Sequence, residues 1–169
     1  MQKIYALTDY KNYFGSKWNS IPYRSGFDKE LLKSYFYNDN FEIEFIRFQD
    51  INFKNNWRDK LVIYTSSEDT GLNYKSYIED IVLGIEKEGA FLLPRFEFLR
   101  ANNNKVYMEI IKGRVLDNEF SSNLSLLYGT LEEMYYDIER NKINFPCVIK
   151  TASGAMSRGV FLARNKNEL

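Results

Sequence analysis

The chain has 169 residues, of which 44% are hydrophobic and 17% aromatic, so it is long enough to bury a sizeable core. Its 23 basic and 23 acidic residues balance, which argues against nucleic acid or an anionic membrane as the main partner. It has no histidine and one cysteine, Cys147, which excludes Ser-His-Asp triads, Cys-His dyads, His-ligated zinc and internal disulfides.

The amino-terminal segment carries no long apolar core, so we expect a strand there rather than a signal peptide. No run reaches the ~18–20 apolar residues that a membrane helix needs. A cytoplasmic location is therefore expected.

Residues 3–8 form a short apolar run and are predicted to be a buried first strand. The polar stretch 9–23 then reads as a loop at the carboxyl end of that strand, where ligands of α/β proteins bind. Its candidate side chains are Asp9, Tyr10, Lys17 and Trp18. A packed surface loop explains any single one of them better.

Ser25 and Asp28 have the spacing of a capping box, which predicts a helix running to about Tyr37. Its apolar positions recur at helical spacing: Phe27, Leu31, Leu32, Tyr35 and Phe36. Residues 41–48 alternate between apolar and polar, which predicts a strand near a sheet edge. Glu42 and Glu44 invite a catalytic interpretation, but a solvated strand face is the better one.

A polar linker is predicted over 49–59, and the apolar run 60–65 is typical of a central parallel strand. An almost complete helical face follows and ends at Gly89, a plausible C′ position. Its members are Tyr74, Tyr77, Ile78, Ile81, Val82 and Ile85. Residues 91–94 begin a fourth strand.

The first part of the chain is thus predicted to be β-α-β-β-α-β: an α/β fold with a small, mainly parallel sheet and flanking helices. It contains neither G-x-G-x-x-G after the first strand nor a Walker P-loop. A Rossmann dinucleotide site and a P-loop nucleotide site are therefore both poor interpretations.

A further helix is predicted after the Asn-rich step at 101–105, with Val106, Tyr107, Ile110 and Ile111 as its apolar positions. Residues 113–129 read as irregular, with a short strand possible at 126–128. Thr130 and Glu133 then form a capping box for a helix that runs to about Asn141.

The last 25 residues read FPCVIKTASGAMSRGVFLARNKNEL, two apolar runs around a small-residue loop, which predicts a β-hairpin. Cys147 is expected to be a small buried strand residue. Lys150 ends the first run, so an ammonium group lies beside a loop rich in backbone N–H groups, as in sites for phosphate-like anions. An ordinary exposed hairpin with a lysine at its end is the alternative.

The order F-P-x-V-x-K, a Gly/Ser loop, G-V and x-x-E-L resembles the nucleotide-binding hairpin of the ATP-grasp family. The resemblance implies that Lys150 lies on the phosphates of ATP and that a lid loop folds over them. The loop residues so implied are Ser153, Gly154, Ala155, Met156, Ser157 and Gly159. The N-K step at Asn104-Lys105 is similar to a helix start of this family, which adds Lys105 to the expected phosphate-binding residues. Helix capping by the Asn, with an exposed Lys105, is the alternative.

Under this resemblance, residues 1–100 are a pre-ATP-grasp, Rossmann-like α/β domain and residues 101–169 begin an α+β ATP-grasp lobe. The expected activity is an ATP-dependent carboxylate–amine or carboxylate–thiol ligation through an acyl phosphate. Magnesium is implied as well, with ligands outside this chain, so we expect the chain to be the incomplete front of a larger enzyme and inactive alone.

The expected partners are a nucleotide and a small carboxylate, with no nucleic acid and no membrane, and a homo-oligomer is compatible with them. The main alternative is a stand-alone α/β binding or regulatory module without catalysis. A nucleotide-sugar transferase is a third interpretation, for which the sequence offers no convincing D-x-D motif.

Overall fold

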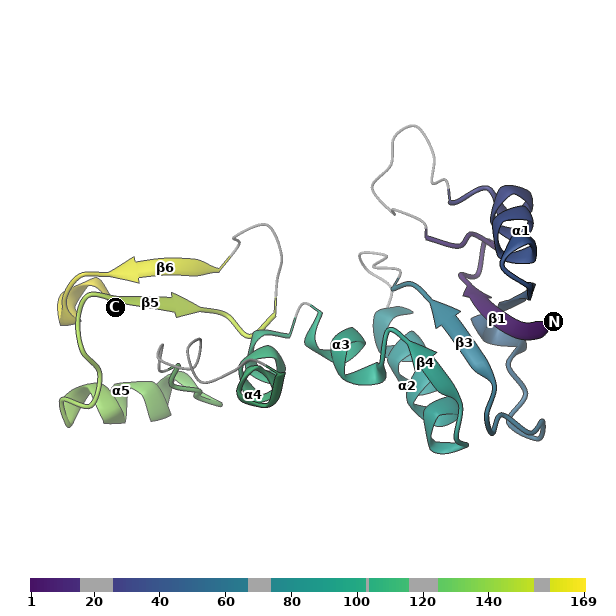
Figure 1. Ribbon diagram of the computed structural model, residues 1–169. Coiled ribbons are helices and arrows are strands. Elements are labelled where there is room, and N and C mark those ends of the chain that lie inside the picture. The colour runs from purple at the N-terminus through teal and green to yellow at the C-terminus, as the bar shows by residue number, and fades with distance from the viewer. Residues whose placement is uncertain (16–25, 67–73, 103, 116–124, 154–158) are drawn as a thin grey trace. The chain divides into compact units, whose positions relative to one another are not determined.

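A computed structural model describes residues 1–15, 26–66, 74–102, 104–115, 125–153 and 159–169 (Figure 1). They form two compact units, Met1–Leu99 (unit 1) and Arg100–Leu169 (unit 2). Among the residues that the structure describes, no helix is long and apolar enough to cross a membrane.

Unit 1 is built on a four-stranded sheet whose neighbouring strands are all parallel, in the order β2-β1-β3-β4. The strands are β1 (Gln2–Thr8), β2 (Phe41–Arg47), β3 (Leu61–Tyr64) and β4 (Phe91–Leu93). Helix α1 (Lys29–Asn38) connects β1 to β2, and helix α2 (Tyr74–Lys87) connects β3 to β4. The predicted α/β fold with a parallel sheet and flanking helices is confirmed, and β2 lies at an edge as expected.

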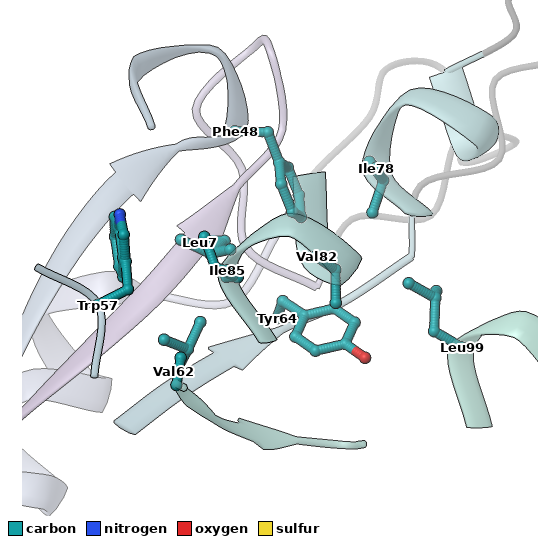
Figure 2. Packing of buried hydrophobic residues seen from close by; sticks show 10 residues of the cluster. Leu7, Phe48, Trp57, Val62, Tyr64, Ile78, Val82, Ile85 and Leu99 are labelled. Carbon is teal, nitrogen blue, oxygen red and sulfur yellow. The ribbon is translucent and has the colours of Figure 1, made fainter. Parts of the chain in front are cut away.

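Side chains alternate between the two faces of this sheet because successive strand residues point in opposite directions. On one face, Ile4, Ala6 and Ile43 are buried, with Leu32 and Phe36 of α1 packed against them. The other face carries the larger cluster, to which α2 contributes three fully buried residues (Figure 2). That cluster consists of Leu7, Phe48, Trp57, Val62, Tyr64, Ile78, Val82, Ile85, Ala90 and Leu99.

The segment 49–59, predicted to be a polar linker, contributes to the core. It begins within the 3-10 turn η1 (Phe48–Asp50), and its Trp57 is only 2% exposed. The indole Nε1 of Trp57 donates a hydrogen bond to the Asn52 carbonyl at 3.0 Å, which satisfies its one polar group. The predicted polar linker is confirmed as an irregular, mostly exposed connection, and its one buried side chain, Trp57, anchors it to the core.

Helix α1 begins at a different residue from the one predicted. Asp28 is the N-cap, and its Oδ1 accepts hydrogen bonds from Glu30 N and Leu31 N, both at 3.0 Å. Ser25, the predicted cap, lies outside the described residues. No residue of α1 is fully buried, and the predicted apolar positions Leu31 and Tyr35 are exposed. Only part of the predicted stripe therefore faces the sheet.

Helix α2 ends as predicted, because Gly89 follows it with φ +93° and its N–H donates to Glu86 O at 2.9 Å. Strand β4 then runs for three residues and stops at Pro94. The short helix α3 (Phe96–Ala101) follows and was not predicted.

Unit 2 contains the helices α4 (Lys105–Val115) and α5 (Leu131–Glu139), the strands β5 (Cys147–Lys150) and β6 (Val160–Ala163), and the 3-10 turn η3 (Lys166–Glu168). The capping box of α5 is confirmed, since Thr130 Oγ1 accepts from Glu133 N and the Glu133 carboxylate accepts from Thr130 N. The short strand considered for 126–128 is wrong, because this segment pairs with no strand of the described chain.

Candidate functional site

The predicted hairpin is present as an antiparallel pair, with Cys147 opposite Ala163 and Lys150 opposite Val160. Lys150 is the last residue of β5 and is exposed, whereas Cys147 is half-buried. One further bond continues the pairing, from Thr151 N to Gly159 O at 2.8 Å. The strand pairing thus delivers the ammonium group of Lys150 to the start of the loop.

The base of the loop requires glycine at position 159. Gly159 has φ +70°, a conformation that side chains rarely adopt, and a Cβ there would overlap the hydroxyl of Thr151. That hydroxyl donates a hydrogen bond to Ser153 O at 2.8 Å. Thr151 therefore fixes both sides of the loop where it leaves the strands.

The first turn of α4 is attached to the same loop. Lys105 N donates to Ala152 O at 2.8 Å, and Asn104 forms an isolated antiparallel bridge with Ser153. Asn104 also caps the helix, since its Oδ1 accepts from Tyr107 N at 3.0 Å. Ala152 and Ser153 lie only two and three residues after Lys150, so these bonds attach the start of α4 next to Lys150. In the sequence, 44 positions lie between Lys105 and Lys150.

Two lysines thus stand at one corner of unit 2. No acidic side chain of the described residues forms an ion pair with Lys150, whereas Lys112 of the same unit pairs with Glu109 at 3.4 Å. The helix start adds the partial positive charge of its backbone N–H groups. This set of donors suits an anion with several oxygen atoms, such as a polyphosphate.

The structure describes only some of the predicted site residues. Lys105, Lys150, Ser153 and Gly159 are described, and the bonds above bring them together. Gly154, Ala155, Met156 and Ser157 lie outside the described residues. The sequence singles out Asn104 through the N-K step before α4, and the structure shows it as the cap. Thr151 was missed, because nothing in the sequence pairs it with Gly159.

The candidate loop of unit 1 has a structural role at its first residue. Asp9 is 3% exposed, and its Oδ1 accepts hydrogen bonds from Lys11 N and Tyr13 N, both at 2.9 Å. The ring of Tyr10 lies edge-on to Tyr74, whose pKa burial raises to about 12. Lys17 and Trp18 lie outside the described residues. On β2, Glu44 pairs with Lys3, as expected of a solvated strand face.

A shallow, open depression beside α5 is lined by acidic and tyrosine side chains, and the carboxylates of Asp137 and Glu133 are already engaged. Asp137 accepts a hydrogen bond from Tyr128 at 3.2 Å and pairs with Lys142 at 2.9 Å, and Glu133 belongs to the capping box. The bond from Lys142 holds the pKa of Asp137 below its usual value. Across the described chain, no group of three or more acidic or cysteine side chains could hold a metal ion.

Compared with known proteins, the chain matches no family model, and no curated protein matches it in sequence.

Proposed function

We propose that the corner formed by Lys105, Lys150 and the segment 151–153 binds the phosphates of ATP, as the resemblance to the ATP-grasp family implies. The observation that carries the proposal is the pair of contacts that attach the start of α4 to the loop after Lys150. They gather two lysines and a helix N-terminus, which are the chemical groups that polyphosphate binding uses.

The donors of this corner fit ATP by their chemistry. An exposed lysine at a strand end offers a compact, mobile ammonium group, and a lysine at a helix start adds a second charge near the positive end of the helix dipole. The lysines would bind and orient the phosphates and offset their charge. Magnesium is a different matter, because no cluster of three or more acidic or cysteine side chains among the described residues could hold it.

We propose further that this phosphate site serves an ATP-dependent ligase, which joins a carboxylate to an amine or a thiol through an acyl phosphate. ATP supplies the phosphoryl group when bound. The role assigned to this chain is to hold the triphosphate, since lysine ammonium groups stabilise charge on phosphoryl oxygens and perform no covalent step.

The test compares the binding of ATP with that of adenosine by calorimetry, with hydrogen exchange of the peptides that span 147–163. ATP should bind and slow exchange there, while adenosine, which lacks phosphates, should do neither. Lys150→Ala should weaken ATP binding by roughly tenfold to a hundredfold, the worth of one charge-assisted hydrogen bond. Lys105→Ala should weaken it as well.

Lys112→Ala is the matched control, because Lys112 lies on α4 but pairs with Glu109. It should leave ATP binding unchanged. Equal affinities of the native protein and Lys150→Ala would contradict the proposed site.

A further inference from the structure

The two faces of the unit 1 sheet are covered unequally. Helix α1 connects β1 to β2, and a right-handed crossover places the connecting helix over those two strands. Strands β3 and β4 continue the sheet beyond it, with β4 at the far edge (Figure 1). In the part of unit 1 that the structure describes, α2 and α3 contribute their buried residues to the main cluster, on the opposite face. The outer half of the α1 face therefore has no helix packed over it among these elements.

The exposed side chains of β4 lie on this outer half. Phe91 pairs in register with Leu61, and Leu93 pairs with Ile63. Residues in register on neighbouring strands point to the same face of a sheet, and Leu61 and Ile63 pack against the cluster under α1. Phe91 and Leu93 thus belong to the α1 face, yet they are 59% and 70% exposed.

Helix α1 borders the same area with an aromatic side chain. Phe36 packs toward the sheet, and Tyr35 lies one residue earlier, about 100° around the helix axis. For a helix in a right-handed crossover from β1 to β2, the flank one residue earlier is the one that points toward β3. Tyr35 is 60% exposed. The flank of α1 and the outer strands therefore border one continuous area of the surface.

This area, here named the apolar strip, is large enough for an interface. Its exposed members and its half-buried floor are Tyr35, Phe91, Leu93, Leu61 and Ile63. Because a fully exposed side chain of this size offers about 150–200 Å², the strip presents about 400 Å² per molecule. A standard interface buries about 800 Å² per partner, of which somewhat more than half is apolar. The strip therefore supplies most of the apolar part of a standard interface.

The chemistry of the strip suits a second copy of itself. None of its side chains is charged, so two opposed strips bury no unpaired charge. A two-fold axis brings the same surface of both partners together and closes the assembly after two copies. The contact is made by side chains on a sheet face and needs no strand addition, in keeping with the short β4 and with Pro94 at its end.

We propose that unit 1 forms a two-fold dimer through the apolar strip, with Phe91 and Leu93 of each copy packed against the strip of the other. The interface uses side chains of unit 1 alone. It therefore stands or falls independently of the phosphate site proposed for unit 2.

The experiment is sedimentation equilibrium of the native protein over a series from micromolar to submillimolar concentration. The mass should rise along the series from the monomer value of 20.1 kDa to twice that value. Hydrogen exchange at the two ends of the series adds a location. Exchange in the peptides of β3 and β4 should slow at high concentration, while exchange in β5 and β6 should not change.

Two variants test the strip from different elements. Leu93→Glu should raise the dissociation constant of the dimer by about a hundredfold or more, because each dimer would bury two unpaired carboxylates. Tyr35→Glu, on α1, should weaken the dimer as well. Both positions are exposed, so the fold should be retained, which circular dichroism checks. Leu162→Glu is the matched control, since it places the same change at a 52% exposed leucine of β6 and should leave the dimer intact.

Three results would overturn the proposal. The first is a native protein that stays monomeric over the whole series, which would mean that something other than a second copy covers the strip. The second is a Leu93→Glu variant that dimerises like the native protein; Tyr35→Glu decides in its place if Leu93→Glu does not fold. The third is a dimer that Leu162→Glu dissociates as strongly as Leu93→Glu does.

Discussion

Unit 1 buries apolar clusters on both faces of one sheet, whereas the described part of unit 2 buries only four hydrophobic residues, Ile111, Met134, Ile138 and Ala163. The hairpin of unit 2 keeps Val148, Phe161 and Leu162 more than half exposed. Unit 1 is therefore held mainly by apolar burial. The proposed phosphate corner of unit 2 depends more on particular hydrogen bonds, caps and one glycine.

The largest effect should come from the core of unit 1. Ile78→Ala removes a side chain that is 0% exposed in the main cluster, and such changes cost about 2–5 kcal/mol of unfolding free energy. Urea unfolding read by hydrogen exchange should place the loss in peptides of unit 1. Leu31→Ala, at a 52% exposed position, should cost less than about 0.5 kcal/mol. Equal losses for both variants would show that unit 1 does not depend on its core.

Gly159→Ala tests the hairpin of unit 2. Positive φ and the overlap with Thr151 should destabilise the strand pair by about 1–3 kcal/mol, seen as faster exchange in β5 and β6. Thr151→Ala in the same chain removes the overlap but keeps the backbone strain, so it should recover part of the loss. No recovery at all would contradict the assigned contact.

A smaller effect is expected at the cap of α5. Thr130→Ala removes the acceptor for Glu133 N and should cost about 1 kcal/mol, measured as a lower melting temperature and faster exchange in α5. Thr130→Ser keeps the oxygen and should behave like the native protein. If serine were as destabilising as alanine, the hydroxyl would not be the stabilising group.

The smallest effect should be a pH dependence at Asp137. Its pKa lies below the usual value in the folded protein, so its contribution is present above the unfolded pKa and is lost as pH falls below about 4. Thermal melts between pH 5 and 2 should show a shallower decline for Asp137→Asn than for the native protein. Lys142→Gln should raise the pKa of Asp137 in a carboxyl titration by NMR; an unchanged pKa would exclude that ion pair.

The sequence predicted those elements whose formation depends on residues close together in the chain. The alternation of residues 41–47, the apolar face of α2, Gly89 and the Thr130 box are signals of this kind. The spacing of Ser25 and Asp28 predicted a helix but not its first residue, because Asp28, the expected box partner, is the N-cap of α1. Residues 126–128 are apolar enough for a strand but meet no partner strand among the described residues.

Less of the candidate site than of the fold could be predicted from the sequence. The position of Lys150 at the end of an apolar run can be read from the sequence. That Lys105 lies near it depends on bonds between segments that are far apart in the chain. The family resemblance implied that approach; periodicity and composition did not. Trp57 and Thr151 were missed for the same reason, since each acquires its role from a neighbour far along the chain.

The two edges of the unit 1 sheet are guarded against unwanted strand addition in different ways. At β2 the outer edge carries Glu42 and Glu44, and inserting charges is one way to discourage another chain from pairing. At β4 the exposed side chains are Phe91 and Leu93, but the strand is three residues long and Pro94, which has no N–H, stops it. Replacing Pro94 would restore a backbone N–H beside these apolar side chains and would make this edge of the sheet more open to pairing with another strand.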